Sequence, residues 1–326
     1  MSQASLHLQP SQDCGNIVQW EHINIDVPDS DITFYFYFQA LGLTVDPYLP
    51  SQFYNRVYWA NVGQQQFHLV RWKHAQVIQG GKLVLQVPCL EQLESRLKAA
   101  EPKLKGTCFQ WNKEEEEEPS KAHVIHVTCP WGNSFMFVEN ERIPRTCGFF
   151  PLVPYPWKLG LCALMTSCAK DSSKGIAKFF RNVLFARVLE TENSAIVCLG
   201  PRQSIVFEEK EDRKLPEYVP GRKEDPMYPD YHLCVYIAEF EKAYQRVEEL
   251  ELLYNDHIFS DKIYSYQDAL LHNQFRFRDI IDLDAHERGE RRVLYQLQFE
   301  TRSLYHPYYM RPLVNRMGHT GIYCFQ

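Results

Sequence analysis

The sequence predicts an α+β protein built from four repeated modules, each with a strand, a helix and further strands. One strand phrase recurs, as EHINIDV at residues 21–27 and as YHLCVYI at residues 231–237. Two related phrases lack the histidine, KLVLQV at residues 82–87 and LGLCAL at residues 159–164. In each phrase apolar side chains recur as they do along a strand, and a segment that reads as a helix follows.

Length and composition limit the possible classes. The chain has 326 residues, which exceeds one ordinary core and fits two domains of typical size. Aromatic residues make up 14% of the chain, a share that favours β-rich cores or a pocket lined with rings. The formal net charge is −6 and no basic stripe occurs, which argues against a nucleic-acid partner.

The sequence shows neither a targeting signal nor a motif of closely spaced cysteines. Residues 1–19 are polar, without the apolar core of a signal peptide, and no run reaches the roughly 18 apolar residues of a membrane helix. The ten cysteines form no C-x-x-C pair, so we expect buried free thiols rather than a zinc site. These observations predict a soluble, cytoplasmic protein with no membrane partner.

The first domain is predicted over residues 17–140, after a disordered N-terminus at residues 1–16. Its first module, residues 17–80, has a strand at 18–27 and a helix at about 30–41. The aromatic run at residues 34–38 resembles a strand by composition. However, Asp29-Ser30-Asp31 before it predicts a helix cap, and Leu41-Gly42-Leu43 after it predicts a helix stop. We therefore interpret the run as helical.

The second module is predicted over residues 81–140. Residues 91–100 have apolar side chains at helical spacing. The acidic run Glu114–Glu118 predicts a solvated loop, with binding of a metal or a basic partner as the alternative. Pro130-Trp131-Gly132-Asn133 lies between two strand phrases and predicts a hairpin.

The second domain is predicted over residues 158–302, after a proline-rich linker at 141–157. Its modules cover residues 158–209 and 230–302, with helices at about 172–184 and 240–250. A tail rich in tyrosine, arginine and histidine follows at residues 303–326. We expect this tail to pack on a domain or on a neighbouring subunit, and a lid over a pocket is the alternative.

The order of these segments and their wording resemble the βαβββ module of the vicinal oxygen chelate superfamily, which includes the glyoxalase, bleomycin-resistance and extradiol dioxygenase families. The phrase FYFQALGL at residues 36–43 is similar to the family's helix ending, and FFRNVL at 179–184 repeats it. The phrase CPWGN at residues 129–133 is similar to its DPxGN hairpin, with cysteine in place of aspartate. The resemblance covers residues 18–302.

The resemblance implies a fold and a metal. Four modules would form two cupped mixed-sheet barrels, and each cup would take metal ligands from the first and last strands of its modules. One inward side chain per strand can converge on such a point because side chains alternate across a strand. Histidine and carboxylate ligands suit one divalent transition metal, which would be Fe, Mn, Ni or Zn.

Carried over by position, the resemblance implies metal ligands at His22 and His68 in the first domain and at His232 with Glu300 in the second. Gln298 is the alternative to Glu300. Two further places carry residues that are not credible ligands, Lys82 and Met136 in the second module, and the third module offers none. Each cup would therefore hold about half a site. The alternative is that the histidines are hydrogen-bonded and metal-free.

Three further residues are candidates for substrate binding. Arg276 and Arg278 alternate with aromatic residues and would clamp an anionic ligand, or else pair with Asp279 or Asp282. His126 would be a third ligand or a substrate contact if its strand faces the cup, with a structural role as the alternative.

Two function classes follow from the resemblance. The first is a metal-dependent dioxygenase, lyase or isomerase that acts on a small molecule with vicinal oxygens. The second is a metal-free binding protein with degenerate metal sites and an aromatic cup for a small ligand. In both classes the partner is a small molecule, and a homodimer is possible. The sequence contains no phosphate-binding loop, dinucleotide fingerprint or hydrolase elbow.

Overall fold

The computed structural model describes residues 15–48, 56–78, 80–114, 124–139, 159–216, 231–255, 260–317 and 322–323. Most of the expected disordered N-terminus, the linker at 141–157 and residues 115–118 of the acidic run lie outside these ranges. The chain forms two compact units. Unit 1 contains His22–Met165 and the C-terminal residues from Pro312, and unit 2 contains Thr166–Arg311 and, of the described N-terminal residues, 15–21.

Module 1 follows the expected order of a strand, a helix and three strands. Its elements are β1 (Ile17–Val27), α2 (Ser30–Thr33), the π-helical segment η1 (Phe34–Ala40), β2 (Thr44–Val45), β3 (Val57–Val62) and β4 (Gln65–Arg71). The carboxylate of Asp29 caps the helix by accepting from the backbone N–H of Ile32 at 2.8 Å. The aromatic run at residues 34–38 is therefore helical, as the flanking signals predict.

Module 2 repeats this order. Its elements are β5 (Lys82–Val87), α3 (Leu90–Leu104), β6 (Gln110–Glu114), β7 (Val124–Thr128) and β8 (Ser134–Glu139). The predicted hairpin joins β7 to β8, which pair antiparallel. Gly132 sits in this turn at a φ of +106°, a conformation that favours glycine.

Modules 1 and 2 share one topology. The first strand pairs parallel with the last one, β1 with β4 and β5 with β8. The strand order is then β4-β3-β2 in module 1 and β8-β7-β6 in module 2, with antiparallel pairing throughout. The first six residues of β9 (Gly160–Ala169) extend the second sheet on the other side of β5. Both sheets are therefore mixed.

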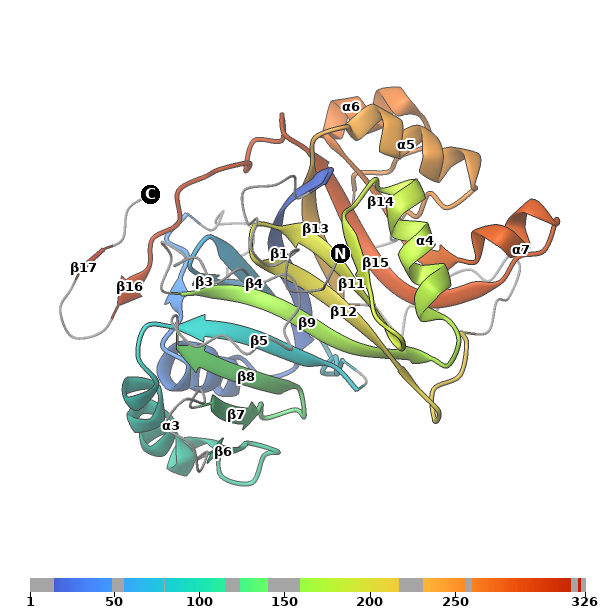
Figure 1. Ribbon diagram of the computed structural model, residues 1–326. Helices are drawn as coiled ribbons and strands as arrows, with labels where there is room; N and C mark the ends of the chain where they lie inside the picture. The colour runs from blue at the N-terminus through green and yellow to red at the C-terminus, as the bar shows by residue number, and fades with distance from the viewer. Residues whose placement is uncertain are drawn as a thin grey trace. The chain divides into compact units, whose positions relative to one another are not determined.

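Helices cover one face of the unit 1 sheets. Figure 1 shows α3 beside the strands of module 2, and α3 also packs against η1. Phe36 of η1 makes ring contacts with Phe109 and Phe135, with centroids 6.0 and 5.7 Å apart. The opposite face of module 2 carries a separate apolar cluster of Val84, Val124, Met136, Val138, Cys162 and Ala163.

Unit 2 contains modules 3 and 4. The end of β9 lies in this unit. Module 3 then continues with α4 (Ser173–Val183), β10 (Val188–Glu190), β11 (Ser194–Gly200) and β12 (Gln203–Lys210). The strands β10, β11 and β12 form an antiparallel meander. Phe180 of α4 contacts Phe207 and Phe299, so the helix packs on strands of both modules.

Module 4 departs from the repeat, as its sequence indicates. It consists of β13 (His232–Ile237), α5 (Phe240–Glu249), α6 (Tyr266–His272), β14 (Gln274–Ile281), α7 (Leu283–Glu287) and β15 (Val293–Ser303). A short helix, α6, replaces one strand of the repeat. The parallel pairing of first and last strands is kept, here between β13 and β15, and β14 pairs antiparallel with β15.

The C-terminal segment packs on module 1 within unit 1. The side chain of Asn315 accepts from the backbone N–H of Gly63 at 2.9 Å and donates to its carbonyl at 2.7 Å. The carbonyl of Val314 accepts from the side chain of Asn61 at 3.0 Å. Two short strands, β16 (Arg316–Met317) and β17 (Ile322–Tyr323), then pair with each other.

The predicted α+β class and the modular order are confirmed, and the sheets are mixed. Closure of the sheets into cups stays a prediction. Within the described ranges, no helix has the length and apolarity that a membrane crossing requires.

Candidate functional site

The four candidate ligands occupy equivalent places in the strand registers. In module 1, His22 of β1 lies opposite Gln66 of β4, and His68 follows two residues later. In module 4 the same offset relates His232 of β13 to Glu300 of β15. Because residues two apart on a strand share a face, each pair lies on one face of its sheet.

Module 2 carries different residues at these places. Lys82 of β5 lies opposite Ser134 of β8, and Met136 follows two residues later. Met136 belongs to the apolar cluster that includes Val84, and it is buried. The register therefore places Lys82 and Met136 where the sequence predicts them, and neither side chain suits a divalent metal.

The two histidines of unit 1 stack on each other. The ring centroids of His22 and His68 lie 3.7 Å apart with an interplanar angle of 20°. Trp59 also stacks on His68, with centroids 4.8 Å apart and an angle of 13°. Ring-nitrogen lone pairs lie in the ring planes, so those of two stacked rings run nearly parallel rather than converging on one ion.

The outer nitrogen of His68 also contacts an amide. Its Nε2 lies 3.1 Å from Oε1 of Gln66. That amide is fixed in turn, because its Nε2 donates to Asp46 at 2.5 Å and to Asn61 at 2.7 Å. The chain of hydrogen bonds sets the orientation of Gln66, and through it that of His68.

The histidine and the carboxylate of module 4 face each other. Nε2 of His232 lies 3.6 Å from Oε2 of Glu300, and each side chain is only 4% exposed. Two arginines hold the carboxylate from either side. Nη2 of Arg276 lies 2.8 Å from Oε2, and Nη2 of Arg302 lies 2.6 Å from Oε1.

The ion pairs extend to two further carboxylates of unit 2. Arg276 also pairs with Asp261, and Arg302 pairs with Glu21 at 3.1 Å. The network thus joins two guanidinium groups with three carboxylates, which leaves one negative charge in excess when His232 is neutral. A cation near Glu300 would balance that charge, as would a proton on His232.

The network keeps its arginines charged. Burial on its own would lower the pKa of Arg276, but the nearby charges of Glu300 and Asp261 raise that pKa above its ordinary value. Arg302 behaves in the same way, and its pKa is raised well above the ordinary value. Burial raises the pKa of the neighbouring Cys234 thiol, which disfavours its thiolate as a metal ligand.

The pair in module 4 fits two ligands of one transition metal. Its nitrogen and oxygen lie 3.6 Å apart, and bonds of about 2.0–2.2 Å from one ion reach both atoms. Neutral imidazole with carboxylate is the donor set expected for Fe, Mn, Ni or Zn. The stacked rings of His22 and His68 fit such an ion less well, for the reason given above.

The other arginine of the predicted clamp lies in a different setting from Arg276. A β-bulge at Arg278 breaks the alternation of β14 between Phe277 and Asp279. The Arg278 side chain stacks over the ring of Tyr254 at 5.2 Å, and its Nε lies 3.6 Å from Asp279. The predicted alternative, an ion pair with Asp279, matches this geometry.

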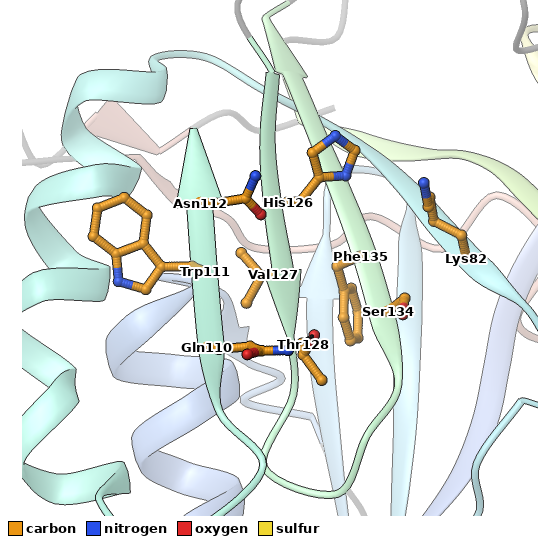
Figure 2. Close-up of a pocket in the computed structure, with 9 residues that line it drawn as sticks. All are labelled: Lys82, Gln110, Trp111, Asn112, His126, Val127, Thr128, Ser134 and Phe135. Atoms are coloured by element: carbon orange, nitrogen blue, oxygen red, sulfur yellow. Dashed lines mark hydrogen bonds between the residues drawn. The ribbon is translucent and has the colours of Figure 1, made fainter. Parts of the chain in front are cut away.

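The remaining substrate-binding candidate, His126, lies in unit 1. Its Nε2 is 3.0 Å from a carboxylate oxygen of Glu114. His126 also lines a pocket of about 360 Å³ on module 2. Six polar side chains of β5, β6, β7 and β8 line this pocket (Figure 2): Lys82, Gln110, Asn112, His126, Thr128 and Ser134.

Several of the residues that surround Glu300 are not among those expected from the sequence. Arg302 follows Glu300 by two residues and so shares its strand face, a signal that strand alternation offers. Asp261 and Glu21 come from distant parts of the chain, and no local pattern points to them. Trp59 and Gln66, which position His68, were missed for the same reason.

Comparison with known proteins identifies the fold. No family model matches the sequence, and no curated protein matches it either. Among solved structures, glyoxalase I from Zea mays aligns with a TM-score of 0.51 at 13% identity, over 87% of this chain and 92% of that one. A variant of that enzyme aligns with a TM-score of 0.50 at 12% identity, over 93% and 97% of the two chains.

Proposed function

Because the chain has the vicinal oxygen chelate fold, we propose that it is a metal-dependent enzyme that acts on a small molecule with vicinal oxygens. The reaction would be a dioxygenation, an elimination or an isomerisation. The proposed metal ligands are His232 with Glu300 in unit 2, which is the better placed pair, and His22 with His68 in unit 1. The observation that supports this choice is their 3.6 Å separation in a buried, negatively charged setting.

The metal would act as a Lewis acid that polarises the oxygen atoms of the substrate. The chain's own residues prepare the ligand atoms for it. Arg276 and Arg302 fix the rotamer of Glu300, because the carboxylate pairs with both guanidinium groups. Burial excludes bulk water from the pair, and the excess negative charge of the network favours a cation.

Metal analysis of the full chain tests the proposal. The protein is purified without chelator, and Fe, Mn, Ni and Zn are counted per chain by mass spectrometry. We expect one metal in the wild type and its loss in His232→Ala and in Glu300→Gln. His286→Ala is the matched control, because His286 lies on α7 and should not affect metal content.

Separate variants test unit 1. If His22→Ala and His68→Ala both keep the metal content of the wild type, the stacked histidines of unit 1 are not its ligands. Wild-type protein that stays metal-free after incubation with each of the four ions would overturn the enzyme proposal. So would a metal that persists in both the His232→Ala and Glu300→Gln variants.

The second candidate is a metal-free protein that binds a small ligand. Two observations favour it. Lys82 and Met136 stand at the ligand places of module 2, and two arginines already pair with Glu300. A folded, metal-free chain that binds small molecules is the result expected for this candidate. The homodimer expected from the sequence stays a prediction in either case.

A further inference from the structure

The pocket on module 2 differs in character from the metal-ligand pairs. It has a volume of about 360 Å³, within the range of small-molecule sites. Its polar residues lie on one face of four neighbouring strands, because the registers align Gln110 with Thr128, Thr128 with Ser134, and Ser134 with Lys82. Figure 2 shows Lys82 and His126 on the same side of these strands.

The charge of Lys82 is the main feature of the pocket. Its side chain is half-buried, and no described residue forms an ion pair or hydrogen bond with it. The carboxylate of Glu114 on β6 is engaged with His126, one of the lining residues, at 3.0 Å. A half-buried ammonium without a counter-charge is available to pair with an anionic ligand.

Other donors line the same pocket. The hydroxyl of Ser134 and the amide of Asn112 form no side-chain hydrogen bond within the described residues, and the amide of Gln110 reaches only Thr128, at 3.5 Å. Trp111, Val127 and Phe135 complete the lining. The pocket therefore offers one cation and several neutral donors.

We propose that this pocket binds a small organic carboxylate without a metal ion. The carboxylate contacts the ammonium of Lys82 and the hydroxyl of Ser134, and the amides of Asn112 and Gln110 bind its polar substituents. A single lysine supplies one positive charge, which matches the one charge of a carboxylate and only part of the charge of a phosphate. The site goes beyond the proposed metal function and does not depend on it.

Binding of three probes to the full chain tests this site. Benzoate is the carboxylate, benzamide is its uncharged analogue, and inorganic phosphate is the competing anion. Affinities are measured by ligand-observed NMR titration. We expect saturable benzoate binding at least tenfold tighter than that of benzamide or phosphate, since a charged hydrogen bond accounts for about that ratio.

Variants assign the binding to Lys82. Lys82→Met should weaken benzoate binding about tenfold or more, whereas Lys82→Arg should keep most of it because the charge is retained. Lys103→Met is the matched control, since Lys103 is an exposed lysine of α3 in the same unit. Circular dichroism checks that each variant is folded. If Lys82→Met does not fold, the benzoate affinity of Lys82→Arg still tests the proposal.

Several results would overturn the proposal. They are the absence of saturable benzoate binding, equal affinity for benzamide, tighter binding of phosphate, or unchanged affinity in folded Lys82→Met. The variants His232→Ala and Glu300→Gln separate this site from the proposed metal. If benzoate binding fails in them but survives in Lys82→Met, the anion binds at the metal, and the module 2 site is wrong.

Discussion

Arg276 and Glu300 form an ion pair with a nitrogen–oxygen distance of 2.8 Å, and both side chains are 5% exposed or less. They lie directly opposite each other on β14 and β15, so the antiparallel register itself brings the two charges together. Arg276 also pairs with Asp261, and Glu300 also pairs with Arg302. The strength of such a buried pair depends on both partners being present.

Removal of one partner should therefore be more damaging than removal of both. Arg276→Met leaves Asp261 unpaired and Glu300 with one arginine, so we expect a loss of about 3–5 kcal/mol in the free energy of unfolding. The double variant Arg276→Met with Glu300→Gln should lose less than the single one. Urea denaturation followed by circular dichroism measures both.

An exposed ion pair provides the control for this prediction. Lys170 and Glu211 pair at 2.6 Å with side chains that are 57% and 80% exposed. Lys170→Met should leave the urea midpoint unchanged because solvent screens such pairs. A loss below about 1 kcal/mol in Arg276→Met would contradict the view that the network is tightly coupled.

The order of the elements could be predicted from the sequence because local signals determine it. Strand alternation, the cap at Asp29 and the turn at Gly132 are local signals, and each gave the element that the structure contains. The positions of the candidate ligands followed from the same local phrases. The register of each parallel strand pair then set the constant offset between His22 and His68 and between His232 and Glu300.

The surroundings of those residues depended on distant parts of the chain. Glu21 and Arg302 are 281 residues apart in sequence, and their contact arises only when the strands are assembled. The stacking of Trp59 on His68 depends on the register of β3 against β4, which no single segment encodes. Local patterns therefore predict which residues are available, and tertiary pairing decides what state they are in.

Removal of the Tyr37 hydroxyl should stabilise the protein. Its hydroxyl is buried, and it has no hydrogen-bond partner among the described residues. An unsatisfied buried hydroxyl destabilises the folded state, so Tyr37→Phe should raise the free energy of unfolding at pH 7 by about 1 kcal/mol. Tyr35→Phe is the control, because Tyr35 is half-buried and should change little.

The advantage of Tyr37→Phe should grow with pH. Burial, and secondly the nearby Cys129 charge, raise the pKa of Tyr37 well above its ordinary value. The unfolded tyrosine ionises near pH 10. As the pH rises through that value, the unfolded wild type loses protons that the folded form retains, so wild-type stability falls. Urea titrations at pH 7 and 10.5 measure the gap, and a constant gap would contradict this assignment.

Glu209 should make the stability of unit 2 sensitive to acid. It accepts hydrogen bonds from the backbone N–H of Ser173 at 2.9 Å and from its hydroxyl at 2.6 Å, at the start of α4. Burial alone would raise the pKa of Glu209, but these hydrogen bonds outweigh it and hold the pKa below its ordinary value. The folded state thus favours the ionised form.

A lowered pKa means that the stabilisation is present above the unfolded value, near pH 4.3, and is lost as the pH falls through the folded value. Glu209→Gln should therefore be about 1 kcal/mol less stable than the wild type at pH 7. The difference should shrink as the pH falls through the folded value. Urea titrations at pH 7 and at a series of lower pH values test this, with Glu211→Gln as the exposed control. A difference that persists unchanged in acid would show that the charge of Glu209 is not the cause.

Asn315 is predicted to fasten the C-terminal segment to module 1. Its amide makes two hydrogen bonds with the backbone of Gly63, and its side chain is buried. Asn315→Ala leaves both backbone groups of Gly63 without these partners, so we expect a loss of about 2–3 kcal/mol in the free energy of unfolding. We also expect faster protease cleavage of the segment that follows, because local opening exposes it.

The neighbouring residue supplies the matched control. Arg316 is exposed, and its backbone N–H donates to the hydroxyl of Thr44 at 2.9 Å, a bond that Arg316→Ala keeps. This variant should match the wild type in both urea unfolding and cleavage rate. Equal behaviour of Asn315→Ala and Arg316→Ala would mean that the segment is held by other contacts. Cleavage of the segment that is slower in Asn315→Asp than in the wild type would also contradict the role of the amide. A carboxylate cannot donate to the carbonyl of Gly63.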